Sequence, residues 1–159
     1  MADDLEALEP WLGDILDSLS PGPKRRLSLK IGQAIRRTNS ARIAKNEEPD
    51  GRAMTPRKPR QRRSTKSGRL KRKAKMFRKL RLVRNMRLRA NPDGVELSFK
   101  GGAARVAAEH HYGEEAFVGR TRDGRTIKTR MEQRRLLGFS RDDQDAIIDA
   151  LAKHISPGN

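Results

Sequence analysis

The chain has 159 residues, of which 34% are hydrophobic and 36% charged, and its formal net charge is +17. This length suits one ordinary domain, and the low hydrophobic content limits the size of its core. The absence of cysteine excludes disulfides, thiolate metal sites and thiol catalysis. No apolar run approaches the roughly 20 residues of a membrane span, and the acidic N-terminus is unlike a signal peptide, so we expect no membrane association.

Most of the excess charge lies in one window of the chain. Between Gly51 and Pro92 there are 18 Lys or Arg residues and no Asp or Glu. The remainder carries 19 basic and 20 acidic residues, so it is close to neutral. Charge that is localised in this way indicates a contact surface or a disordered arm.

The N-terminal part of the chain has the pattern of two helices. Leucines and isoleucines recur at helical spacing within residues 3–19, which predicts an amphipathic helix. Ser20 followed by Pro21 is typical of a helix N-terminus, and a second apolar stripe continues from there to about Lys45. A turn at residues 49–51 then ends the helix. The tight corner between the two helices predicts a helical hairpin.

A basic segment follows the predicted hairpin of helices. Residues 52–68 are rich in Arg, Lys, Pro, Ser and Thr, and Met54 is their only large apolar residue. Such a segment cannot bury enough surface to offset its ordering entropy. We therefore predict that residues 52–75 form a basic flexible loop or arm within a single domain of residues 1–159. A short basic helix or extended stretch is expected around residues 71–79.

The clearest strand signal surrounds the Asn-Pro-Asp-Gly sequence at residues 91–94. Apolar and polar residues alternate on both sides of this turn, which predicts an antiparallel hairpin. The predicted register pairs Met86 with Phe99, Leu88 with Leu97 and Ala90 with Val95 on one apolar face. The opposite face then pairs Arg87 with Ser98 and Arg89 with Glu96.

The C-terminal part of the chain predicts a short helix, a second ribbon or loop, and a final helix. Residues 103–111 are alanine-rich, and residues 114–130 contain an Asp-Gly turn at 123–124. Ser140 and Asp143 have the spacing of a capping box at the start of the last helix. Its apolar stripe would consist of Ile147, Ile148, Leu151 and Ile155.

This element order predicts an α+β fold. We expect the N-terminal helical hairpin and the C-terminal helix to pack on a small antiparallel sheet.

We find no combination of residues that resembles a catalytic site, and no residues that would bind a cofactor. His110 and His111 are adjacent, and neighbouring side chains on a helix point about 100° apart, so they do not converge on one metal ion. We interpret them as packing or subunit-contact residues. Asp142, Asp145 and Asp149 lie on one side of the last helix, where they could meet a basic loop of a neighbouring subunit. The first of these acids also suits the helix dipole.

The basic arm is the main candidate for a functional surface. It could approach DNA, dock on acidic surfaces of neighbouring proteins, or remain a solvated loop. Specific base reading is not expected, because the window holds one aromatic residue and no known recognition motif. The candidate contact residues are Arg57, Lys58, Arg60, Arg62, Arg63, Lys66, Arg69, Lys71, Arg72 and Lys73.

Several short stretches occur in an order that is more informative than any of them alone. They are Leu19-Ser20-Pro21 with Arg25-Arg26-Leu27, Ile35-Arg36-Arg37 through Ser40-x-Arg42-Ile43, Pro49-Asp50-Gly51 with Thr55-Pro56-Arg57, Gly68-Arg69 with Lys75-Met76-Phe77-x-Lys79-Leu80, His110-His111-Tyr112-Gly113, and Arg134-Arg135-Leu136-Leu137-Gly138-Phe139-Ser140. From about residue 15 to residue 155, this order resembles the phage virion morphogenesis family.

The resemblance implies a structural, non-enzymatic protein of a phage virion or of a headless tail-like particle, assembled in the host cytoplasm. It implies a role in completing the head-proximal end of the tail and in head-tail joining. A homo-oligomeric ring is expected, with six-fold symmetry to match the tail tube. The expected partners are tail terminator or tail tube proteins, head-connector proteins and, without sequence preference, packaged DNA.

Composition alone also fits a different class, a nucleic-acid-binding basic protein without sequence specificity. Such a protein should retain duplex DNA at about 150 mM salt with a steep salt dependence. An assembly protein should show only weak binding that salt easily screens.

Overall fold

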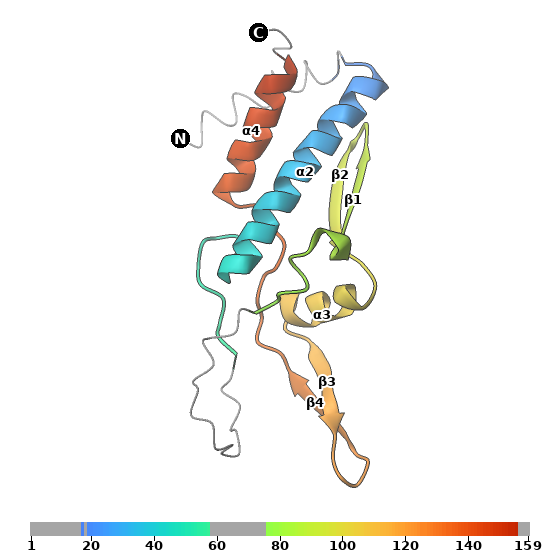
Figure 1. Cartoon of the computed structure of the whole chain (residues 1–159), viewed down its shortest axis with the longest axis vertical. Coiled ribbons are helices and arrows are strands. Elements are labelled where there is room, and N and C mark those ends of the chain that lie inside the picture. The colour runs from blue at the N-terminus through green and yellow to red at the C-terminus, as the bar shows by residue number, and fades with distance from the viewer. Residues whose placement is uncertain (1–16, 18, 58–75, 156–159) are drawn as a thin grey trace.

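The computed structural model describes residues 17, 19–57 and 76–155 (Figure 1). They form α2 (Pro21–Lys45), the 3₁₀ turn η1 (Val83–Asn85), β1 (Met86–Asn91), β2 (Gly94–Phe99), α3 (Gly102–His111), β3 (Glu115–Arg120), β4 (Thr126–Arg130) and α4 (Arg141–Ile155). The strands make two separate antiparallel pairs, β1–β2 and β3–β4. These elements confirm the α+β class. None of the helices in this described part has the length and hydrophobicity to span a bilayer.

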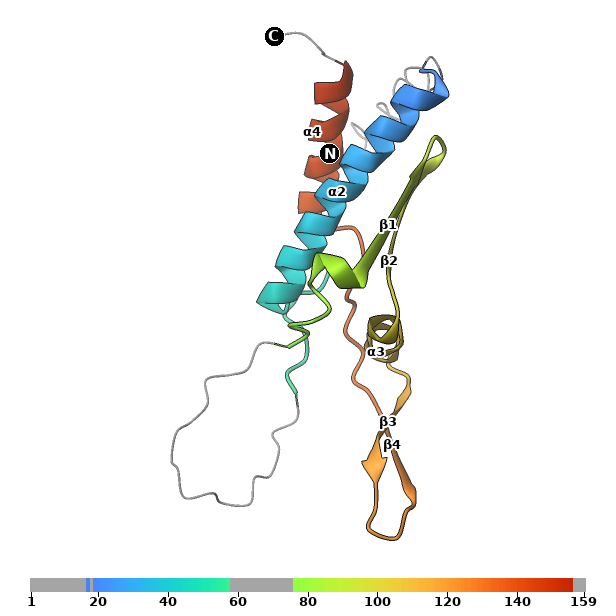
Figure 2. The same cartoon turned by 45° about the vertical axis from the view of Figure 1, so that its right-hand side comes forward.

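Helix α2 lies at the centre of the arrangement, between α4 on one side and the β1–β2 hairpin on the other (Figures 1 and 2). The C-terminal helix was expected on the sheet, and its packing along α2 is a correction to that prediction. The physical reason is that α2 already packs against both strands of the hairpin. Leu151 of α4 is buried as predicted, whereas Ile148 is 47% exposed and does not belong to the buried stripe.

Both ends of α2 agree with the sequence. Ser20 has extended backbone angles at the N-cap position, Pro21 opens the helix, and no side-chain capping bond forms. Asn46 ends it in the left-handed conformation with φ of 61°, a common termination for which asparagine is suited. The predicted first helix, residues 3–19, lies almost entirely outside the described residues. The helical hairpin therefore stays a prediction.

The β1–β2 hairpin has the predicted register in all five pairs, from Met86–Phe99 to Ala90–Val95. It also gains a sixth pair, Asn91–Gly94, so that only two residues lie in the turn. The Asn91 side chain stabilises this turn by accepting hydrogen bonds from the amides of Asp93 at 3.1 Å and Gly94 at 2.8 Å.

The hairpin approaches α2 closely at Gly32. A Cβ atom at this position would lie 2.5 Å from Leu88 Cδ1 and 2.5 Å from Val95 Cγ2. The missing side chain therefore permits the contact between helix and hairpin, which outweighs the lower helix propensity of glycine.

The core lies at the C-terminal end of α2 and gathers segments from both sides of the basic window. Its members are Ile43, Met54, Met76, Phe77, Leu80, Met86, Ala107 and Leu136. The prediction that residues 52–68 do not pack is wrong for residues 52–57, because Met54 is 3% exposed and its amide donates to the Asn46 carbonyl at 2.7 Å. Residues 76–82 form turns rather than a helix or a strand. Residues 58–75, the rest of the predicted arm, lie outside the described residues.

The second ribbon confirms the prediction for residues 114–130. Strands β3 and β4 pair with an irregularity between Phe117 and Gly119. Gly124 forms the turn with φ of 81°. In both views the ribbon projects beyond α3, away from the rest of the described chain (Figures 1 and 2). Ala116 is its only buried residue.

Candidate functional site

The segment between the ribbon and α4 crosses the core without joining either sheet, so its buried backbone groups need other partners. Leu136 is fully buried, and its amide donates to Nδ1 of His111 at 3.2 Å. Its carbonyl accepts a hydrogen bond from the Arg42 guanidinium at 3.3 Å. The amide of Gly138 donates to Oδ1 of Asn39 at 3.3 Å. Side chains of α2 and α3 thus take the place of a partner strand.

Asp143 joins the same network from the first turn of α4. Its carboxylate accepts from the amide and the hydroxyl of Ser140, each at 2.8 Å, which confirms the predicted capping box. It also accepts from the Thr38 hydroxyl and from Nδ2 of Asn39 at 3.3 Å. The Arg42 guanidinium donates to Oδ1 of Asn39. The N-terminus of α4 is therefore fixed to the C-terminal third of α2 by buried polar groups.

Arg42 is 8% exposed, which makes its charge costly to bury. Burial lowers the pKa of Arg42 from its ordinary value, while the charges of Asp143 and Glu47 act in the opposite direction. The guanidinium keeps its proton in proteins, so it remains a cation. Its Nε atom has no hydrogen-bond partner among the described residues. The carboxylate of Asp143 therefore matters for tolerating this cation inside the fold.

Arg134 is a second buried arginine and is 3% exposed. Its guanidinium donates to the carbonyls of Thr55 at 2.6 Å, Pro56 at 3.2 Å and Glu132 at 3.1 Å. It also lies 3.2 Å from Nδ1 of His110. Because arginine can only donate, the histidine nitrogen accepts. Burial lowers the pKa of Arg134 as well. These hydrogen bonds hold Thr55 and Pro56, at the start of the basic window, against α3.

The two histidines are packing residues within the chain, which confirms one of their two predicted roles. Burial lowers the pKa of His110, and the charge of Arg134 lowers it further. Burial and the charge of Arg135 lower the pKa of His111. The described residues contain no group of three or more acids and histidines placed to hold a metal ion. A subunit contact by these histidines stays a prediction.

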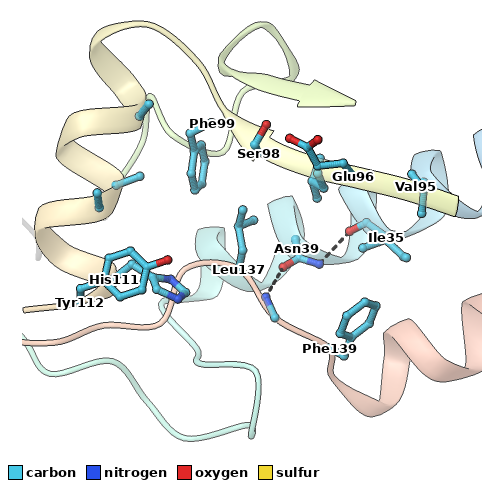
Figure 3. Close-up of a pocket in the computed structure, with 16 residues that line it drawn as sticks. Ile35, Asn39, Val95, Glu96, Ser98, Phe99, His111, Tyr112, Leu137 and Phe139 are labelled. Atoms are coloured by element: carbon cyan, nitrogen blue, oxygen red, sulfur yellow. Dashed lines mark hydrogen bonds between the residues drawn. The ribbon is translucent and has the colours of Figure 1, made fainter. Parts of the chain in front are cut away.

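An apolar groove of about 560 Å³ lies between α2, β2, α3 and residues 137–139. Figure 3 shows Phe99 and Leu137 on opposite walls, with Tyr112 and Phe139 at opposite ends. Both end residues are aromatic and strongly exposed, Tyr112 by 65% and Phe139 by 67%. The groove is thus an apolar surface open to a partner.

A second cavity of about 500 Å³ adjoins the groove, and Phe139 lines both. We call this cavity the acidic recess. It is lined by three basic residues, Arg42, Lys45 and Arg141, and by four acidic residues, Glu47, Glu48, Asp50 and Asp142. The structure therefore places Asp142, but not Asp145 or Asp149, with other acids. Asp145 is exposed on α4, and Asp149 is bonded to Lys153 at 2.6 Å.

Only one of the ten predicted arm residues lies in the described part of the chain. Arg57 is exposed and lines a third cavity together with Phe77, Arg78 and Lys79. The predicted contacts of the other nine, from Lys58 to Lys73, lie outside the described residues.

Sequence reasoning missed the buried polar residues Asn39, Arg42 and Arg134 and the exposed aromatics of the groove. A signal existed for two of them. Asn39 and Arg42 follow Ile35 by four and seven positions, so both lie on the apolar stripe of their helix. A polar residue on such a stripe indicates a buried hydrogen bond.

Sequence comparison gives the class of this protein. The profile of the phage virion morphogenesis family matches residues 3–156, and the chain belongs to this family. It is similar to tail completion protein S of Escherichia phage P2, with 34% identity over 157 residues that cover 96% of this chain and 97% of the relative. No solved structure matches the chain.

The buried network predicts very different costs for two neighbouring aspartates. Asp143→Ala should lower the free energy of unfolding by about 3 kcal/mol, because it removes the cap and leaves Arg42 as a buried cation with less compensation. Asp142→Ala, at an exposed position of the same turn, should cost less than about 1 kcal/mol. Urea unfolding measures both, and equal costs would contradict the network.

The lowered histidine pKa values predict acid sensitivity. The unfolded state binds protons near pH 6.5, whereas the folded state binds them only at lower pH. Stability should therefore be complete above about pH 6.5 and fall as the pH drops toward the folded-state values. His111→Asn keeps an acceptor for the Leu136 amide but cannot titrate, so thermal unfolding from pH 7 to 5 should show a shallower decline. An unchanged slope would contradict this role for His111.

Proposed function

We propose that this chain is a structural subunit that completes the head-proximal end of a phage tail and takes part in joining the tail to the head. The similarity to a tail completion protein runs over nearly the whole length of both chains, and this observation carries the proposal. The described residues support a structural rather than a catalytic role, because their buried polar groups bind one another and the backbone.

The subunit acts within a homo-oligomeric ring, with six-fold symmetry as the expected arrangement, that forms in the host cytoplasm and becomes part of the virion neck. Tail terminator or tail tube proteins lie on one side of the ring and head-connector proteins on the other. Two features support contacts of this kind. The apolar groove and the projecting ribbon both expose large apolar side chains that a partner would cover.

The basic segment contributes a contact to this assembly. Its flanks are fixed in the core, by Met54 on one side and by Met76, Phe77 and Leu80 on the other. The segment that carries the remaining Lys and Arg residues of the predicted arm therefore starts and ends in the chain next to core residues. We infer that they bind acidic surfaces of neighbouring subunits, and that contact with packaged DNA, where it occurs, is without sequence preference.

Particles made without the gene test the proposal. Electron microscopy should show free heads beside incomplete tails, and a plasmid copy of the gene should restore joined particles. Normal particles in the absence of the gene would contradict the role. A gel shift with duplex DNA addresses the competing class, because tight binding at about 150 mM salt would favour a nucleic-acid-binding protein instead.

A further inference from the structure

The β3–β4 ribbon is incomplete in the isolated chain. A two-stranded ribbon alone is at best marginally stable in water. This one exposes Phe117 by 57%, Val118 by 50% and Ile127 by 41%. Within the described residues, neither outer edge of the ribbon pairs with another strand. Exposed apolar side chains on an unpaired ribbon are a liability unless a partner covers them.

The groove presents the complementary surface. Its walls are mainly apolar, and its exposed aromatics, Tyr112 and Phe139, are of the residue types enriched at protein interfaces. Glu96 is the one carboxylate that lines it. A segment that enters this groove should therefore bring apolar side chains, with basic rather than acidic neighbours.

The charges of the ribbon and of the acidic recess are also complementary. Around its turn the ribbon carries Arg120, Arg122 and Arg125 against the single acid Asp123. The acidic recess beside Phe139 is lined by four carboxylates and by the cations Arg42, Lys45 and Arg141, so its lining has a formal excess of one negative charge. Each surface thus has an apolar part followed by a charged part, and the charged parts have opposite sign. Opposite charges favour this pairing over contacts between two basic surfaces.

We propose that the ribbon of one copy of this chain docks in the groove of a second copy, with Phe117, Val118 and Ile127 against the apolar walls and the basic turn toward the acidic recess. The ribbon projects away from its own chain's body, so the occupant comes from another copy (Figures 1 and 2). Such a contact joins two different surfaces, and repeating it gives a ring when the rotation between copies closes and an open filament when it does not. The inference rests on the proposed function for its setting, a ring at the end of a tail.

The absence of cysteine from the chain permits a direct cross-linking test. A double variant carries Val118→Cys in the ribbon and Ala108→Cys in the groove wall. After mild oxidation of purified tails, a non-reducing gel should show a ladder of disulfide-linked oligomers. The matched control combines Ala108→Cys with Val83→Cys, which is 57% exposed but lies outside both surfaces, and it should run as a monomer.

The outcomes separate this inference from the proposed function. If the wild-type protein is present in purified tails but the double variant gives no ladder, the ribbon contact is overturned and the proposed function still stands. Absence of the wild-type protein from tails overturns the function itself. Equal ladders from the double variant and its control would also overturn the contact, because they would show cross-linking without specificity.

A charge substitution provides a second readout. Phe117→Asp changes an exposed residue, so the melting temperature of the isolated chain should be unchanged. Incorporation of the variant into tails should fall at least about tenfold, because truncating an interface anchor commonly costs that much or more. Normal incorporation of Phe117→Asp would contradict the inference.

Discussion

The structure depends on a constraint that its irregular C-terminal segment imposes. Residues 131–140 pass through the core without a partner strand, and each buried amide and carbonyl along them needs a hydrogen bond. Asn39, Arg42 and His111 supply three of these bonds from two different helices. Asn39 also donates to Asp143, which caps α4 at Ser140, and this link fixes the start of α4 on α2. A small apolar core is thereby complemented by a polar one.

This construction separates a rigid body from the surfaces that it presents. The buried hydrogen bonds of Arg42 and Arg134 hold the described elements together, and those of Arg134 fix residues 55 and 56 at the start of the basic window. Among the described residues, the large apolar side chains of the ribbon and the groove aromatics Tyr112 and Phe139 stay exposed. Exposed apolar side chains of this kind are typical of interaction surfaces, which suits a member of the phage virion morphogenesis family.

The sequence predicted those parts of the fold that depend on local patterns. Alternation and turn chemistry predicted the β1–β2 register, and cap residues predicted where α2 and α4 begin. The sequence did not predict which elements pack together. Helix α4 packs on α2 instead of the sheet, and the burial of Met54 places residues 52–57 against the core. The groove could not be predicted at all, because its walls come from four segments that only the tertiary fold brings together.

Amide hydrogen exchange, compared between the isolated subunit and assembled tails, separates the rigid body from the partner-dependent surfaces. The amides of Leu136, Gly138 and Asp143 should be protected in both states, because their partners lie within the chain. The amides of residues 115–130 should exchange rapidly in the isolated subunit and become protected on assembly. A ribbon that is fully protected in the free subunit, or a segment 136–143 that exchanges as fast as the ribbon, would contradict this division of the molecule.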